Sequence, residues 1–191
     1  MHPQMPLPAR VPAHANEEGD GIVVGNGPVI IDAYIDFQCP FCRMFEEASG
    51  PLLDAMVSEG QVTLVYHPMG FLDAMSTSRY STRASAASGC ASDGGKFMEY
   101  LYTLFANQPP EGGPGLSDEE LIALGRQVGL TDAFAVCVRD GLHLDWPPYV
   151  TARAAERGVS STPTVLVEGA IVRPHPSLIR AAVGAALHSG V

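Results

Sequence analysis

Cys39 and Cys42 form a Cys-Pro-Phe-Cys stretch, the strongest sign of chemistry in this chain of 191 residues. The pair follows an apolar run, residues 29–37, and opens an amphipathic one, so we expect it where a strand meets a helix. In the first turn of a helix, free backbone N–H groups and the positive end of the helix dipole stabilise a thiolate. Pro40 fits that turn because its missing N–H costs nothing there. We therefore predict an exposed attacking sulfur at Cys39 and a more buried resolving sulfur at Cys42.

A structural disulfide and half of a zinc site are the two alternatives for this pair. A zinc site usually needs a second pair of Cys or His residues at short spacing. The other cysteines, Cys90 and Cys137, stand 47 residues apart, and no two histidines have the spacing of metal ligands. A structural disulfide rarely closes so short a loop at the start of a helix. The sequence therefore favours a redox pair, and it predicts neither a metal nor a cofactor.

The elements that must position this pair follow from hydrophobic periodicity and turn residues. The predicted strands are residues 21–25, 29–37, 61–66, 164–167 and 170–172. The predicted helices are residues 40–58, 76–91, 96–106, 117–128, 131–140, 147–157 and 176–188. Gly50-Pro51 should kink or interrupt the first helix, and Ser117 with Glu120 forms a capping box for the fourth. We divide the chain into a disordered leader (1–20), one domain formed by residues 21–70 and 159–191, and a helical insertion (71–158).

The composition limits the classes of partner. The formal net charge is -10 at pH 7, which argues against nucleic acid and against an anionic membrane surface. No stretch of the sequence is long and apolar enough to span a bilayer. The first twenty residues contain four prolines and lack the apolar core of a signal peptide, so they are expected to be disordered. If the protein is exported, we expect its signal or anchor to lie outside this sequence.

Taken in order, these elements resemble the thioredoxin fold, which is of the α/β class. The helical insertion after the third strand resembles the DsbA-like branch, and in particular its exported actinobacterial members. Three stretches carry the resemblance: residues 36–42 resemble a D-x-x-C-P-x-C motif, residues 84–105 the helices of the insertion, and residues 161–164 the loop with the cis-proline. The resemblance covers roughly residues 21–190.

The resemblance implies further residues of the site. Pro163 would be cis and would face the Cys39–Cys42 pair, since a cis bond costs little before proline. The backbone of Thr162 would then lie open beside the first cysteine and pair with an incoming peptide like an added strand. Pro40 and Phe41, between the two cysteines, complete the implied active site.

The second pair of cysteines, Cys90 and Cys137, resembles a structural cysteine pair of the exported relatives. The resemblance therefore implies a structural disulfide, which suits an even cysteine count in an exported protein. Two free buried thiols and a second redox pair remain the alternatives. His143 and Trp146, near the end of the insertion, are expected only to pack.

Ala33 marks a departure from the family. Many thioredoxin-fold oxidoreductases carry a buried carboxylate six residues before the first active-site cysteine, where it can relay a proton. Here that position is Ala33, and strand alternation points the flanking Asp32 and Asp36 to the other face. We therefore expect Asp36 to be a surface or strand-end carboxylate, and we expect either water or a shifted register to replace the relay.

The function that the resemblance implies is that of a protein-disulfide oxidoreductase. It would donate the Cys39–Cys42 disulfide to reduced or unfolded secreted polypeptides, act outside the cytoplasm as a monomer, and be reoxidised by a membrane partner. A reductase or isomerase of the same fold is the first alternative, mildly favoured by Thr162. A binding or chaperone-like module with purely structural cysteines is the second, and it predicts a buried and unreactive Cys39.

Overall fold

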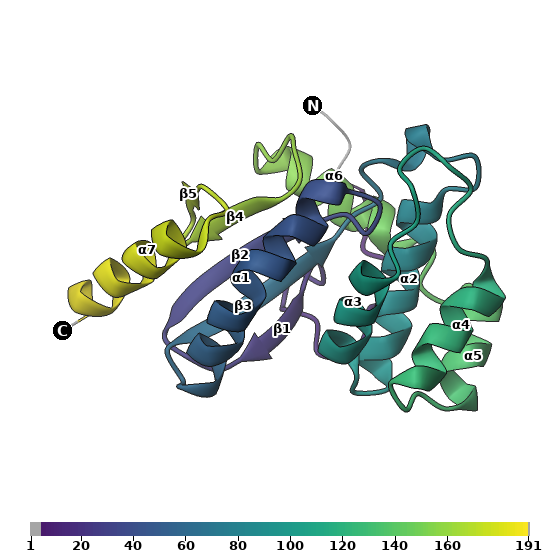
Figure 1. Ribbon diagram of the computed structural model, residues 1–191, viewed down its shortest axis with the longest axis horizontal. Helices are drawn as coiled ribbons and strands as arrows, with labels where there is room; N and C mark the ends of the chain where they lie inside the picture. The colour runs from purple at the N-terminus through teal and green to yellow at the C-terminus, as the bar shows by residue number, and fades with distance from the viewer. Residues whose placement is uncertain (1–4, 191) are drawn as a thin grey trace.

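The computed structural model describes residues 5–190 and contains one mixed sheet of five strands (Figure 1). The strand order is β1-β3-β2-β4-β5, in which β2 and β3 are parallel and all other neighbours are antiparallel. The strands are β1 (Ile22–Gly25), β2 (Val29–Ile35), β3 (Val62–Pro68), β4 (Thr164–Val167) and β5 (Ala170–Val172).

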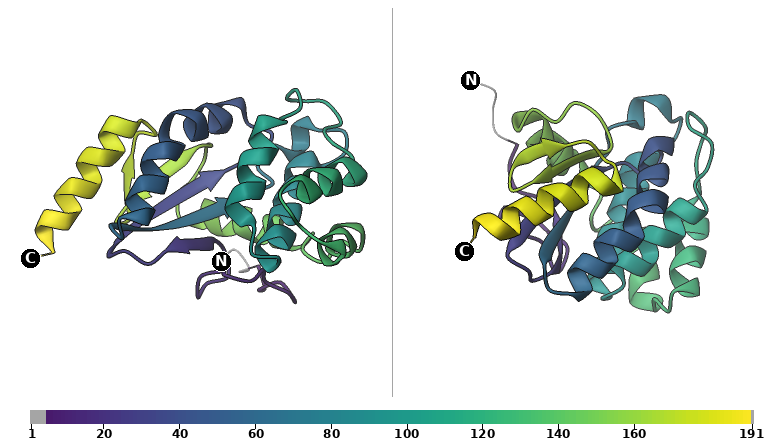
Figure 2. Two further views of the ribbon diagram at one scale, coloured as in Figure 1. Left: turned by 60° about the horizontal axis from the view of Figure 1, so that its bottom comes forward. Right: turned by 60° about the vertical axis from the view of Figure 1, so that its left-hand side comes forward.

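Seven α-helices and one 3-10 turn surround the sheet in the described part of the chain. They are α1 (Pro40–Ser58), η1 (Asp73–Met75), α2 (Tyr80–Asp93), α3 (Phe97–Ala106), α4 (Asp118–Gln127), α5 (Asp132–Arg139), α6 (Trp146–Glu156) and α7 (Pro176–Ser189). Helices α2 to α5 form a cluster beside the sheet, whereas α1 and α7 lie along it (Figures 1 and 2). None of the described helices combines the length and the hydropathy that crossing a membrane requires.

The predicted elements and the predicted fold class are confirmed. Each strand and each helix expected from the sequence is present, with ends shifted by a few residues. One detail differs, because α1 continues through Pro51 without interruption. Proline removes a single hydrogen bond of a helix, and burial of residues such as Leu53 and Met56 beyond it compensates for that loss.

β2 positions the active site because it is the central strand. It pairs with β3 on one side and β4 on the other, and its alternate residues Val29, Ile31, Ala33 and Ile35 are buried. A strand with neighbours on both sides and an apolar inner face is held firmly in register. The loop that follows Ile35 therefore leaves the sheet at a fixed point, directly before α1.

The segment expected to be a disordered leader is packed where the structure describes it; residues 1–4 lie outside the described range. Trp146 Nε1 donates a hydrogen bond to the carbonyl of Gly19 at 2.8 Å, and the backbone N–H of Ala13 donates to Asp93 at 2.8 Å. Asp20 is buried. Gly19 and its partner Trp146 are more than one hundred residues apart in sequence, and Ala13 and its partner Asp93 are eighty apart. No local sequence pattern could therefore predict these contacts.

Glu46 is a buried acid on the inner face of α1 that no sequence pattern marked. Its Oε2 accepts a hydrogen bond from the hydroxyl of Tyr66 at 3.1 Å, and its Oε1 has no partner. Burial raises the pKa of Glu46 to about 8, against an ordinary value of 4.5. The side chain is therefore protonated at neutral pH.

Replacing Glu46 with Gln is expected to stabilise the protein at pH 8 more than at pH 5. The native state holds the proton of Glu46 more tightly than the unfolded chain does, so unfolding releases it between about pH 4.5 and 8 and stability falls as the pH rises. Gln cannot ionise, so its advantage should grow by up to about 1.4 kcal/mol per pH unit across that window. Urea unfolding at pH 5, 6.5 and 8 measures this difference. Glu47→Gln, on the exposed side of the helix, is the matched control and should show no such pH dependence; an equal effect of Glu46→Gln at all three pH values would contradict the assignment.

Candidate active site

Cys39 and Cys42 lie at the junction between β2 and α1, as the sequence predicted. Cys39 is the N-cap of α1, Pro40 is its first residue, and Cys42 lies within its first turn. Both thiols are free in this structure. The two side chains therefore meet where the helix presents its unpaired N–H groups.

Cys39 is less exposed than expected. It is 4% exposed and Cys42 is 0% exposed, so the order of burial is as predicted but the first sulfur is not open to solvent. A side chain from a distant loop lies against the backbone here: Gln108 Nε2 donates to the carbonyls of Phe37 at 3.0 Å and Cys39 at 2.9 Å. The loop after α3 thus covers the backbone beside the first cysteine.

The two thiols differ in acidity. The pKa of Cys39 is lowered to about 6, chiefly by a hydrogen bond from the Cys42 thiol, and further by Thr162 and by the backbone N–H groups of Cys42 and Phe41, against the opposing effect of burial. Burial raises the pKa of Cys42 well above its ordinary value, and the neighbouring Cys39 sulfur raises it further. Cys39 is therefore a thiolate at neutral pH, and Cys42 is a thiol that donates to it.

Thr162 and Pro163 reach the site from the other end of the chain. The peptide bond between them is cis, and the Cys39 thiol, when protonated, donates to the carbonyl of Thr162 at 3.6 Å. Both residues are half-buried and directly precede β4. The fold thus brings the two predicted motifs together across 123 residues of sequence.

Asp36 lies at the end of β2, as one of the two expectations had it, but it is fully buried and is not a surface carboxylate. It follows the last residue of β2, where strand alternation no longer decides the side-chain direction. Its Oδ1 accepts from the Ser81 hydroxyl at 2.7 Å and from the backbone N–H of Gln38 at 2.9 Å, and its Oδ2 accepts from the N–H of Leu72 at 2.8 Å. Its own N–H donates to the Cys42 sulfur at 3.5 Å. Asp36 therefore ties the active-site loop to α2 and to the loop after β3.

The carboxylates near Ala33 do not restore the expected relay. Ala33 is buried beside Tyr66 on β3 and carries no acid, and the Glu46 carboxyl group contacts the Tyr66 hydroxyl. Asp32 lies on the opposite face of the sheet, as predicted, where it contacts His67 Nε2 at 2.7 Å. The backbone N–H of Asp36, rather than its carboxylate, makes the hydrogen bond to the Cys42 sulfur.

Replacing Asp36 with Asn is expected to lower the pKa of Cys39 further. Burial raises the pKa of Asp36 to about 6, and the charges on Asp36 and Cys39 raise each other's pKa, so removing one charge stabilises the other. The rate of iodoacetamide alkylation of Cys39, measured against pH, should have its midpoint near pH 6 in the parent and at a lower pH in the variant. Asp32→Asn, on the other face of the sheet, should leave the midpoint unchanged. An equal shift in both variants, or none in Asp36→Asn, would disprove the direct effect.

Large apolar side chains stand exposed around the cysteine pair. Phe41 is 67% and Met44 60% exposed on the first turns of α1. Phe71 and Met75 are exposed in the loop after β3, the loop that Asp36 binds through Leu72. Apolar side chains on two adjoining segments form a surface suited to an apolar polypeptide.

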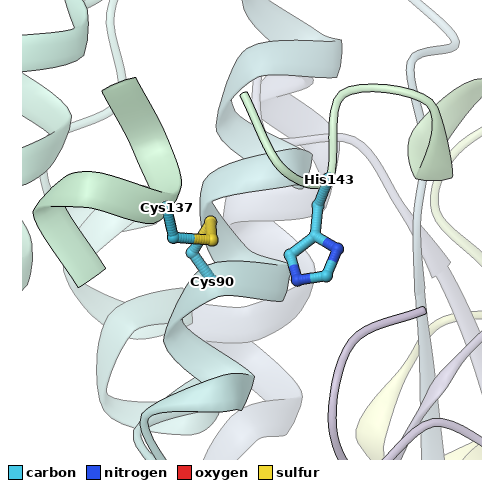
Figure 3. A group of neighbouring side chains, drawn as sticks. All are labelled: Cys90, Cys137 and His143. Atoms are coloured by element: carbon cyan, nitrogen blue, oxygen red, sulfur yellow. A yellow bond between two sulfur atoms is a disulfide. The ribbon is translucent and has the colours of Figure 1, made fainter. Parts of the chain in front are cut away.

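Cys90 and Cys137 form a disulfide between α2 and α5, which confirms the predicted pairing over two free thiols (Figure 3). The sulfur atoms are 2.06 Å apart and the bond joins positions 47 residues apart in the chain. His143 lies beside it and is buried, as expected for a packing residue. The insertion is thus closed covalently, and the cysteines at the head of α1 remain free.

Comparison with known proteins agrees with this geometry. The family model described as thioredoxin matches residues 17–183. The structure of reduced DsbA from Mycobacterium tuberculosis is 29% identical and superimposes with a TM-score of 0.76, covering 86% of this chain and 90% of that one. The disulfide bond oxidoreductase DsbG from the same organism is 30% identical, with a TM-score of 0.77 and 86% of each chain covered.

Part of a longer protein is also similar in sequence to this chain. The serine/threonine-protein kinase PknE of Mycobacterium tuberculosis is 32% identical over 159 residues, which are 76% of this chain. The chain spans only 28% of the length of PknE. That match therefore concerns a part of the kinase, and no activity of the whole kinase follows from it.

Proposed function

The chain belongs to the thioredoxin family, and from that membership we propose that it is a thiol:disulfide oxidoreductase that donates the Cys39–Cys42 disulfide to other polypeptides. The observation that carries the proposal is the unequal acidity of the pair, with the Cys39 pKa lowered to about 6 and the Cys42 pKa raised. A stabilised Cys39 thiolate favours the reduced protein and so makes its disulfide oxidising.

The reaction begins from the disulfide form. A substrate thiolate attacks the Cys39 sulfur, the Cys39–Cys42 bond breaks, and Cys42 leaves and takes up a proton. The second substrate thiolate then attacks the mixed disulfide, so that the substrate disulfide forms and Cys39 leaves as a thiolate. The substrate dithiol is oxidised and the protein disulfide is reduced by the same two electrons.

The substrates we propose are reduced or unfolded secreted polypeptides. The exposed apolar side chains of Phe41, Met44, Phe71 and Met75 would hold an unfolded segment, and the half-buried backbone at Thr162 would pair with it. We place the protein outside the cytoplasm because the Cys90–Cys137 disulfide persists only where thiols are oxidised. It would act there as a monomer and be reoxidised by a membrane partner.

The reverse direction, a reductase or isomerase, is the alternative that a specific observation favours. The chain is as similar to DsbG as to DsbA, and Thr162 stands before the cis-proline.

Equilibration of the Cys39–Cys42 pair in glutathione redox buffers tests the proposal. We expect a midpoint well above the glutathione poise, near the values of strongly oxidising family members. A midpoint well below it would replace the oxidase with a reductase. If Cys39 in the folded, reduced protein failed to react with iodoacetamide at pH 7, the pair would be structural and the proposal would fall.

A further inference from the structure

Cys90, Cys137 and His143 bring three candidate metal ligands together inside the insertion (Figure 3). One comes from α2, one from α5 and one from the turn that follows α5. Taking one sulfur from each cysteine and one ring nitrogen from His143, all three atoms lie within 4.8 Å of one another. All three residues are buried, so ligands here would be shielded from water.

The His143 ring is held on one side only. Its Nε2 lies 2.6 Å from a carboxylate oxygen of Asp93, the last residue of α2. Its Nδ1 is buried and has no hydrogen-bond partner. A buried polar atom without a partner carries a cost, and a ring bound on one side can turn toward the sulfurs. The Asp93 carboxylate holds the ring through Nε2 and leaves Nδ1 as the nitrogen that can bind a metal.

A small cavity adjoins the three side chains. Its volume is about 60 Å³, and Cys90, Cys137 and His143 all line it. Two arginines line it too, but each is bound to an acid: Arg83 to Asp118 at 3.0 Å and Arg139 to Glu119 at 2.8 Å. The space next to the sulfurs therefore carries no uncompensated positive charge among its lining residues.

We propose that Cys90, Cys137 and His143 become a Zn²⁺ site with three protein ligands when their disulfide is reduced, and that the Asp93 carboxylate orients His143 through Nε2. A dithiol supplies two electrons and two protons, the S–S bond breaks to give two thiols, and the dithiol becomes its own disulfide. Zn²⁺ then displaces both thiol protons to the buffer and binds two thiolates. Tetrahedral coordination with Zn–S bonds of about 2.3 Å requires the sulfurs to separate to roughly 3.8 Å, a movement within reach of side-chain rotation.

The site makes the disulfide and the metal alternative cross-links between α2 and α5. Thiolate and imidazole ligands suit Zn²⁺ among the common divalent ions. The spacing of the ligands in sequence did not indicate this, because 47 residues separate the two cysteines and the site is assembled only by the packing of helices.

Metal binding is tested with Co²⁺ as a spectroscopic probe and Zn²⁺ as its competitor. The protein used carries Cys39→Ser and Cys42→Ser, so that no active-site thiol can bind the metal. It is reduced with dithiothreitol, desalted without oxygen and titrated with Co²⁺. We expect one equivalent to bind, with sulfur-to-cobalt charge-transfer absorption and the visible bands of a tetrahedral site, and we expect Zn²⁺ to abolish both. The oxidised protein should show neither.

His143→Gln in the same background is the decisive variant. Loss of a ligand should weaken Co²⁺ binding at least about 10-fold, since even the partners of ligands contribute that much. Asp93→Asn should weaken binding less. If the reduced protein unfolds without metal, far-UV circular dichroism should return when Zn²⁺ is added. Co²⁺ binding that is equal with and without His143, the absence of thiolate absorption, or a reduced chain that stays unfolded in Zn²⁺ would each overturn the proposal.

Discussion

Replacing Cys39 or Cys42 with Ser is expected to reduce disulfide donation to the rate seen without protein, because neither variant can form the Cys39–Cys42 disulfide. The reduced Cys42→Ser protein is expected, in addition, to trap a substrate that itself carries a disulfide. A serine at position 39 offers no sulfur for the substrate to attack, and no thiolate of lowered pKa to leave at the end. In reduced Cys42→Ser, the Cys39 thiolate attacks the substrate disulfide and one substrate sulfur leaves as a thiolate. The mixed disulfide then persists, because no Cys42 thiol is present to release it. Oxidation of a peptide with two thiols, followed by mass spectrometry, measures the first effect, and non-reducing electrophoresis measures the second.

The double variant Cys39→Ser, Cys42→Ser is the control for trapping and should form no mixed disulfide. It keeps the Cys90–Cys137 bond, so any transfer that it retains would come from that second disulfide. If Cys39→Ser transferred disulfides at the parental rate, the reaction would take place at another site, and the assignment of both cysteines would be wrong.

The part of the site that could be predicted from sequence is the part encoded locally. The Cys-Pro-Phe-Cys stretch, the strand before it and the helix after it are contiguous, so hydrophobic period and helix-start signals define them together. Ser117 with Glu120 is a similar case, since the capping box expected from three residues of spacing is present in the structure. Such patterns can be recognised in the sequence without knowledge of any tertiary contact.

The features that sequence reasoning missed depend on partners far along the chain. The buried Asp36 accepts a hydrogen bond from Ser81, 45 residues later, and Gln108 reaches back to the carbonyl of the buried Cys39. Glu46 lies on the inner face of α1 among apolar residues, where its residue type alone would suggest an exposed side chain. In each case tertiary packing overrides what the local sequence favours.

These long-range contacts give the insertion a part in the active site. Gln38, next to the cysteine pair, donates to the Ser81 hydroxyl at 3.1 Å and accepts from the N–H of Gly112 at 2.9 Å. The loop after β2 is thus held by α2 and by the loop that follows α3. A change that makes the insertion less stable should therefore also weaken the contacts that hold the loop around Cys39.

Removing the Cys90–Cys137 disulfide, by replacing both residues with Ala, is therefore expected to cost both stability and reactivity. A bond that closes a loop of 47 residues restricts the unfolded chain, which corresponds to about 4 kcal/mol of native stability, or roughly a thousandfold in the unfolding equilibrium. Alanine is chosen because both positions are buried and a serine hydroxyl would lack a partner there.

Urea unfolding of the oxidised parent and of Cys90→Ala, Cys137→Ala measures this loss. The parent reduced by dithiothreitol, with a chelator present to keep metal away, should lose a similar amount, because it lacks the same cross-link. Cys39→Ser, Cys42→Ser should lose little, since its cysteines are two residues apart and free in this structure. If the alanine variant kept parental stability, the disulfide would contribute nothing to the fold. If it lost stability while the alkylation rate of Cys39 at pH 7 stayed unchanged, the contacts of Ser81 and Gln108 would hold the active-site loop without help from the covalent bond between α2 and α5.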